Sequence, residues 1–189
     1  FYTVQMLVSG VAVTSKRFKT KQEAEGFAQK VNAADKAKIS KMETTTKSEK
    51  PPLLYDLTSL QRDANKYYGF TAQQTLDYTQ SLYEKKLVTY PRTDSRYLTD
   101  DMDDSTAHLC CLMKEKYGYT KMVPVHTKQV LNSSKVSDHH AIIPTENVSD
   151  ADYSEIPSGE QKILGLVTAR FLSSVGDSAE ITEYALEVE

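Results

Sequence analysis

The 189-residue sequence lacks the features of several protein classes. It has no apolar run long enough to cross a bilayer as a helix and no signal peptide, so we expect no membrane partner. The two cysteines, Cys110 and Cys111, are adjacent and poorly placed to pair, which predicts a reduced, cytoplasmic setting and buried helical positions for both thiols. Zinc clusters, glycine-rich phosphate loops and internal repeats are also absent.

Charge is present but unevenly distributed. The net charge of −3 is not typical of a strong duplex-DNA binder. Residues 16–50 nevertheless carry an excess of five positive charges, whereas residues 138–189 carry an excess of nine negative charges. The basic segment is either a solvated surface or a nucleic-acid contact. Because the sequence begins at Phe1 and ends inside an alternating run, we expect the chain to be part of a longer protein.

The first fifty residues predict a small β unit with one helix. Residues 1–13 alternate apolar and polar side chains, which indicates one or two strands bent at Gly10. Thr20 and Glu23 form a capping box that opens a helix ending near residue 33. In residues 35–50 we expect a strand that includes Ile39 and Met42, and an exposed linker or arm in the remainder.

The two prolines at residues 51 and 52 predict a domain boundary, and a helical block follows them. Asp56 caps a helix over residues 57–68 that stops at Gly69, and Thr71 opens a second helix that ends near residue 86. A short strand over residues 87–90 comes next. Two helices and an adjoining strand are typical of a helix-turn-helix with a wing, a common nucleic-acid-binding module.

The remainder of the chain predicts two more helices and a returning strand. Residues 99–101 open a helix to about residue 117, and the acidic side chains at 100, 101, 103 and 104 fit helix capping better than a metal site. A short apolar strand follows the two histidines at 139 and 140, and a last helix covers residues 158–175. Residues 182–188 alternate like a strand. We therefore predict an α+β fold: a mostly helical winged-helix domain (53–177) inserted into a partial β domain (1–52 and 178–189).

Residues 87–98 hold the groups best suited to phosphodiester chemistry. The predicted strand breaks at proline 91, and Tyr90 offers a hydroxyl nucleophile just before it. The two arginines offer planar donor forks, the hydroxyl side chains offer further donors, and the aspartate is able to orient either arginine. These residues are Arg92, Thr93, Asp94, Ser95 and Arg96. The alternative is that Tyr90 is a packing residue followed by a polar turn.

Three stretches together resemble the type IA DNA topoisomerases, and most closely the bacterial topoisomerase III branch. They are residues 51–61, 81–98 and 138–145. The family's active-site signature stands here as Thr-Tyr-Pro-Arg-Thr-Asp-Ser at residues 89–95, and the Leu-Leu-Tyr-Asp-Leu run at 53–57 favours the topoisomerase III branch. The match spans about residues 51–175. It implies a CAP-like winged-helix domain inserted into the β arch that forms the family's gate.

The resemblance implies a role for each residue of the signature. Tyr90 is the expected nucleophile, which attacks single-stranded DNA and leaves a 5′-phosphotyrosine link and a free 3′-hydroxyl. Arg92 is expected to hold the scissile phosphate, and His139 to contact DNA phosphate and organise the site. Thr93, Asp94 and Ser95 are expected to orient Arg92 and the backbone. Arg96 and His140 complete the expected DNA-binding set, although position 140 varies between branches.

The same resemblance implies partners outside this sequence. The family's second catalytic half is an acidic, Mg²⁺-binding Toprim domain, and nothing here resembles it, so we assign no metal or cofactor to these residues. We expect a nucleoid-associated cytoplasmic enzyme that relaxes or decatenates DNA without ATP, and no relaxation by this chain alone. The alternative is a non-catalytic winged-helix module that binds DNA or protein. A tyrosine recombinase or replication-initiator nuclease has less support, because their spaced Arg/His set and His-hydrophobic-His motif are absent.

Overall fold

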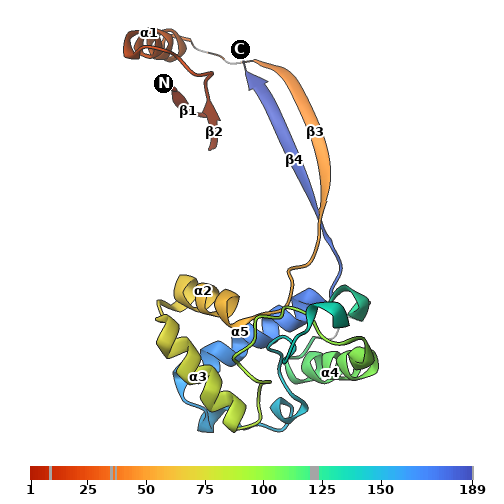
Figure 1. Ribbon diagram of the computed structural model, residues 1–189. Coiled ribbons are helices and arrows are strands. Elements are labelled where there is room, and N and C mark those ends of the chain that lie inside the picture. The colour runs from red at the N-terminus through yellow and green to blue at the C-terminus, as the bar shows by residue number, and fades with distance from the viewer. Residues whose placement is uncertain (9, 35, 37, 120–123, 189) are drawn as a thin grey trace. The chain divides into compact units, whose positions relative to one another are not determined.

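The computed structural model describes all residues except 9, 35, 37, 120–123 and 189 (Figure 1). It mixes helices with strands and divides into two compact units, Phe1–Lys47 with Thr182–Glu189, and Ser48–Ile181. The sequence-based divisions lie after residues 52 and 177, whereas the units divide after residues 47 and 181. Among the described residues, no helix combines the length and the apolar character needed to span a membrane.

The first unit begins with a β-hairpin and a helix. Strands β1 (Gln5–Val8) and β2 (Val11–Thr14) pair antiparallel, and Gly10 turns the chain between them with a φ of 84°, as predicted. Helix α1 (Lys21–Asn32) begins at the predicted capping box, in which the Thr20 hydroxyl accepts from the Glu23 backbone N–H. The turn and the cap act between residues that are near one another in sequence, so the sequence predicts both elements.

The predicted linker after Met42 is wrong. Residues 39–49 form one long strand, β3 (Ile39–Glu49), which pairs with β4 (Ala179–Val188) in a two-stranded sheet. In Figure 1 the two strands run side by side along their length. Lys47 Nζ forms an ion pair with Glu183 at 2.6 Å across the pair. Every side chain of β3 is exposed, so its polar composition resembles that of a linker although its backbone is a strand.

The second unit starts with the two predicted helices, α2 (Leu57–Tyr68) and α3 (Ala72–Glu84). Asp56 accepts from the Ser59 backbone N–H at 2.6 Å, and Gly69 ends α2 in the left-handed conformation. Thr71 caps α3 through the Gln74 backbone N–H at 3.1 Å. Each boundary follows from hydrogen bonds within one helical turn, which explains why the sequence predicts it well.

The other two α-helices of this unit that the structure describes begin without a side-chain cap. The chain forms a 3₁₀ turn at Asp100–Met102 before α4 (Asp103–Lys116), and Thr99 makes no side-chain capping bond. Helix α5 (Ser158–Ser174) has Pro157 at its N-cap, so no side chain caps it. Cys110 lies buried in α4, whereas Cys111 is exposed, which contradicts the expected burial of both thiols.

The core of the second unit lies where α5 packs against α2, α3 and α4. The apolar side chains that α5 buries are Ile163, Leu164, Val167 and Phe171, as their helical spacing predicts, whereas Leu172, predicted with them, is only partly buried. Opposite them lie Leu60 and Ala64 of α2, Leu82 of α3, and Leu109 and Met113 of α4. Tyr67 is exposed although its helical spacing from Leu60 and Ala64 predicts an inward position, and Tyr83, whose spacing places it on one helix face with Leu82, is exposed as well. The helices thus form a packed scaffold that presents several aromatic rings at its surface.

The predicted strands at residues 87–90 and 141–145 are reduced to isolated bridges. Val88 pairs with Pro144, and Ile142 pairs with Tyr55. One backbone bond runs from Thr89 N–H to the Ile143 carbonyl at 3.0 Å. The reciprocal bond is missing because the Ile143 N–H donates to the Thr89 hydroxyl instead, at 3.0 Å. A side chain therefore replaces the backbone acceptor, and the ladder stops at Thr89.

Candidate active site

Tyr90 lies between two other rings. Its ring centroid is 4.3 Å from that of His139, with the planes tilted by 42°, and 5.4 Å from that of Tyr83, which meets it edge-on. Tyr83 comes from the last turn of α3 and His139 from the loop before the Ile142 bridge. Tyr90 is half-buried, while His139 is exposed. The structure therefore brings together two of the three residues predicted to be catalytic.

Two threonines hold the His139 loop against the Tyr90 loop. The Thr89 hydroxyl donates to the Ala141 carbonyl at 3.0 Å, and the Thr93 hydroxyl donates to the His139 carbonyl at 2.8 Å. These threonines flank Tyr90 on both sides in sequence, so the two bonds fix the ring pair from either end. Thr93, which was expected to orient Arg92 and the backbone, contacts the backbone at His139.

The rest of the signature also serves the backbone of the loop. The Ser95 hydroxyl donates to the Lys135 carbonyl at 2.9 Å and accepts from the Tyr97 N–H at 3.1 Å. Arg96 Nε donates to the Leu54 carbonyl at 3.1 Å, which ties the loop to the segment before α2. Asp94 is exposed and accepts a long bond, 3.4 Å, from the Ser137 hydroxyl. Through these contacts Asp94, Ser95 and Arg96 hold the conformation of the loop.

Arg92 and His140 differ from the loop-holding residues. Arg92 is exposed, and its guanidinium has no hydrogen-bond or ion-pair partner within the part of the chain that the structure describes. His140 is half-buried and its Nδ1 lies 2.8 Å from the Ala141 carbonyl. The donors of Arg92 are therefore available to an anionic ligand, whereas one ring nitrogen of His140 is already engaged.

Beneath the site lies a polar cluster that the sequence did not predict. Asp63 of α2 accepts from the Tyr55 hydroxyl and from Arg170 Nη2 of α5, both at 2.6 Å. Arg170 also donates to the Leu53 carbonyl at 3.2 Å and stacks 4.2 Å from the Tyr55 ring centroid. Burial, together with the hydrogen bond to Asp63, raises the pKa of Tyr55 far above its ordinary value.

This cluster positions the segment on which the active-site loops rest. The carbonyls of Leu53, Leu54 and Tyr55 accept from Arg170, Arg96 and the Ile142 N–H, respectively. Since Ile142 lies three residues after His139, the cluster is linked through the Tyr55–Ile142 bridge to the loop that carries the histidine. In the sequence, the one indication of this cluster is an acidic residue, Asp63, three positions after Leu60 and therefore on nearly the same face of the predicted helix.

A second ion pair fixes the end of α3. Glu160 of α5 is buried and pairs with Lys85, and it accepts from the Ser81 hydroxyl at 2.9 Å. Lys85 and Ser81 flank Tyr83, the ring that meets the edge of Tyr90. The first turn of α5 therefore holds one wall of the site in place.

The arrangement combines a half-buried phenol, a neighbouring imidazole and an open guanidinium. A phenol supplies an oxygen nucleophile, and the guanidinium supplies donors for a phosphate. The side chains around Tyr90 do not fit a divalent cation, because they lack the cluster of oxygen ligands that Mg²⁺ prefers. Across the described residues, no group of three or more His, Cys, Asp or Glu side chains is placed to hold a metal.

Comparison with known proteins gives the family. A family model described as DNA topoisomerase matches residues 1–189. The chain is 37% identical to DNA topoisomerase 3 of Bacillus subtilis over 97% of its own length, and 43% identical to that of Shouchella clausii over 72%. These matches span 27% and 20% of the relatives, so the chain covers about a quarter of their length.

The fold has a match among solved structures. Topoisomerase I from Thermotoga maritima superposes with a TM-score of 0.69 and 22% identity, over 97% of this chain and 30% of that one. The chain belongs to the DNA topoisomerase family. Its relatives place it among the type IA enzymes, which are isomerases, on the topoisomerase III branch.

Proposed function

We propose that this chain carries the nucleophile of a type IA topoisomerase that breaks and rejoins single-stranded DNA. The observation that supports the proposal most directly is the ring pair of Tyr90 and His139, held by hydroxyl bonds from Thr89 and Thr93. Residues that need only fill a core would not require two side-chain clamps around an accessible phenol. Family membership supplies the substrate class.

The proposed step is a transesterification. The Tyr90 oxygen forms a bond to phosphorus, the bond from phosphorus to the 3′ oxygen breaks, and the phenol proton is balanced by the proton that the 3′-hydroxyl gains. One phosphodiester replaces another, so the reverse reaction reseals the strand without ATP. A phenol with an ordinary pKa of about 10 needs help to ionise near pH 7.

Residues beside Tyr90 would supply part of that help. Arg92, with its free donors, would bind the scissile phosphate and stabilise the charge that develops there. His139, whose ring lies beside that of Tyr90, would contact DNA phosphate and help to organise the site. Thr93, Ser95 and Arg96 would act as positioning residues, since they bond to backbone carbonyls.

The remaining parts of the site would come from elsewhere in the parent polypeptide. We propose that a Toprim domain supplies acidic side chains and Mg²⁺, and that the complete protein relaxes or decatenates DNA in the cytoplasm, associated with the nucleoid. In this arrangement α2 and α3 serve as a helix-turn-helix of CAP type, with the Val88–Pro144 bridge in place of a wing. Strands β3 and β4 belong to the gate arch. This chain alone should leave a supercoiled plasmid unrelaxed.

The test is covalent trapping by the complete parent protein. A single-stranded oligonucleotide is labelled at either its 3′ or its 5′ end, mixed with protein and Mg²⁺, and denatured. A 5′-phosphotyrosine link predicts a labelled protein band from the 3′-labelled strand only, because the 5′-labelled piece leaves with its free hydroxyl. Tyr90→Phe should abolish the band, and Tyr97→Phe, in the same loop, should retain it.

The competing function is a non-catalytic winged-helix module, which the adjacent helices α2 and α3 favour. A pure binder would form no adduct with either label, and its DNA affinity would be unchanged in Tyr90→Phe. That pair of results would retire the nucleophile assignment. A band that persists in Tyr90→Phe would move the chemistry to another residue.

A further inference from the structure

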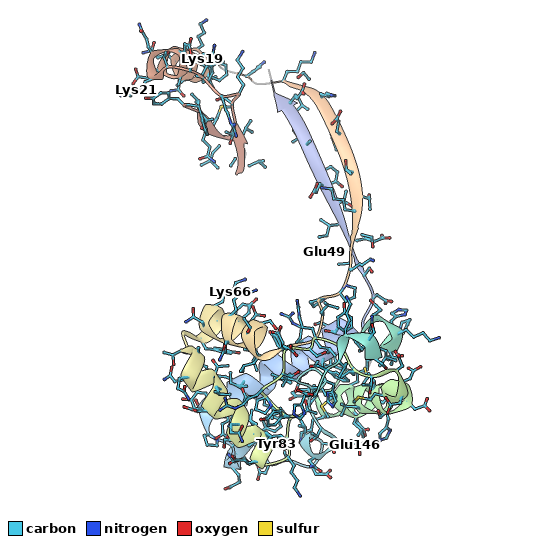
Figure 2. All side chains as sticks on the ribbon, viewed as in Figure 1. Lys19, Lys21, Glu49, Lys66, Tyr83 and Glu146 are labelled. Carbon is cyan, nitrogen blue, oxygen red and sulfur yellow. The ribbon has the colours of Figure 1, made fainter. Side chains whose placement is uncertain are left out.

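A group of aromatic rings and lysines lies on the second unit at the opposite end of α3 from Tyr90. We call it the aromatic–lysine cluster: Lys66, Tyr67, Tyr68, Phe70 and Lys162. Its residues come from the last turn of α2, the turn into α3 and the first turns of α5. Figure 2 labels Lys66 on α2 and Tyr83 at the end of α3 remote from α2.

The cluster is packed in a fixed order. Tyr78 of α3 lies against Gly159, where a Cβ atom would come within 2.6 Å of its ring. Phe70 meets Tyr78 edge-on with centroids 5.3 Å apart, and Tyr68 lies 5.7 Å from Phe70. Lys162 Nζ is 5.4 Å from the Tyr68 centroid and 5.7 Å from that of Phe70. The inner rings are therefore anchored, and they support the outer ones.

The outer part of the cluster is open to solvent. Tyr67 is 59% exposed and Tyr68 is 40% exposed, although both belong to a helix that packs against the core. Lys66 Nζ lies 5.2 Å from the Tyr67 centroid, so each exposed ring has a cation beside it. Neither lysine forms a salt bridge in the part of the chain that the structure describes.

The local charge is positive where the rings are exposed. The carboxylates of the same elements are taken up elsewhere: Asp63 pairs with Arg170, and Glu160 pairs with Lys85. The remaining acids are Asp77 and Glu84 of α3, both exposed, which accept from the Gln73 and Gln80 amides at 2.7 and 3.0 Å; Glu84 lies at the end of α3 next to Tyr83, away from the cluster. Exposed rings beside unpaired ammonium groups fit a ligand that has both flat apolar faces and negative charges.

We propose that the aromatic–lysine cluster is a second binding site for single-stranded DNA, apart from the site of cleavage. Bases stack on Tyr67 and Tyr68, whose faces accept any base, and Lys66 and Lys162 contact the phosphates between them. Duplex DNA fits less well, because its bases are already stacked on one another. The site holds the strand without reading its sequence.

The position of the cluster defines how it would act with Tyr90, and this part rests on the proposed function. Helix α3 has 13 residues, so its ends lie about 20 Å apart. At the spacing of a stacked strand, about 3.4 Å per nucleotide, that distance corresponds to about six nucleotides. A strand bound at both sites would be held at a fixed distance from the cleaved phosphate.

The test measures binding of fluorescent single-stranded oligonucleotides to this chain by anisotropy. Tyr68→Ala should weaken binding at least about fivefold, the usual effect of losing one stacked base, and Tyr68→Phe should restore it. Lys162→Ala should reduce the slope of log affinity against log salt by about 0.7, the value for one single-strand phosphate contact. Tyr184→Ala removes another exposed tyrosine, on β4, and is the control that should bind normally.

The outcomes separate this site from the catalytic proposal. Equal affinities for Tyr68→Ala and Tyr184→Ala, an unchanged salt slope in Lys162→Ala, or no binding by the unmodified chain would each overturn the proposal. Thermal unfolding of each variant excludes loss of folding as the cause, as does recovery by Tyr68→Phe. Tyr90→Phe should leave the Tyr68 effect intact. Covalent trapping that fails while the Tyr68 effect persists would overturn only the catalytic assignment.

Discussion

Removing the Arg170 guanidinium is expected to destabilise the helical unit more than any surface substitution. The group touches the Asp63 carboxylate, the Tyr55 hydroxyl and the Leu53 carbonyl, and it stacks on the Tyr55 ring. Arg170→Ala leaves a carboxylate and a backbone carbonyl that each lose a charged donor. It also removes the polar contacts that join α5 to Asp63 of α2 and to the segment that supports the His139 loop.

The magnitude follows from the burial of the pair. Truncating one partner of a fully buried ion pair costs about 3–5 kcal/mol. The side chains of Arg170 and Asp63 are 19% and 20% exposed, so water screens part of the interaction. We expect a loss of about 2–4 kcal/mol in the free energy of unfolding, which corresponds to a fall in Tm of about 10 °C.

The assay is urea unfolding followed by circular dichroism at 222 nm, with a double-mutant cycle. Asp63→Asn should itself destabilise the protein, and the combined variant should lose about 1–3 kcal/mol less than the sum of the two. Arg62→Ala removes an exposed arginine of α2 and should change stability by less than about 0.5 kcal/mol. The reasoning would be refuted if Arg170→Ala lost no more stability than Arg62→Ala. It would also be refuted if the losses from Arg170→Ala and Asp63→Asn simply added in the combined variant.

Three further predictions concern single groups. The raised pKa of Tyr55 means that the native state keeps a proton that the unfolded state loses above pH 10. The free energy of unfolding should therefore fall above pH 10 by up to about 1.4 kcal/mol per unit, and Tyr55→Phe should flatten this fall in urea titrations; a slope unchanged by the substitution would contradict the assignment. Thr168 has a buried hydroxyl without a hydrogen-bond partner in the described structure, so Thr168→Val should stabilise by about 1 kcal/mol, whereas Thr93→Val should destabilise by about 1–2 kcal/mol and slow covalent trapping. The same sign for both valine variants would contradict this contrast. Gly69→Ala should cost about 1 kcal/mol because its φ is 69°, and Gly165→Ala, inside α5 with free space at its Cβ position, should gain about 0.5–1 kcal/mol in thermal unfolding; a stabilising Gly69→Ala would show that the turn relaxes.

The sequence alone determined the features that depend on near neighbours. Thr20, Asp56 and Thr71 start helices at the predicted residues, and Gly69 ends one, because each signal acts through hydrogen bonds within a single turn. The resemblance of residues 89–95 and 138–145 to the topoisomerase family predicted Tyr90 and His139 as site residues, and their roles stay predictions. The α+β class followed from the order of these elements.

Tertiary structure decided how those elements meet. The strand predicted at residues 87–90 stops at one bridge because the Thr89 hydroxyl takes the place of a backbone acceptor. Arg170 and Tyr55 are 115 positions apart, so no local pattern could pair them, although their cluster supports the His139 loop. Periodicity predicted that Tyr67 would face inward, yet the packing of the helices leaves both Tyr67 and Tyr83 at the surface. The hydrogen bonds that start or end a helix join residues a few positions apart, so the local sequence is enough to predict them. The partners of a side chain across the core are determined only when the helices pack.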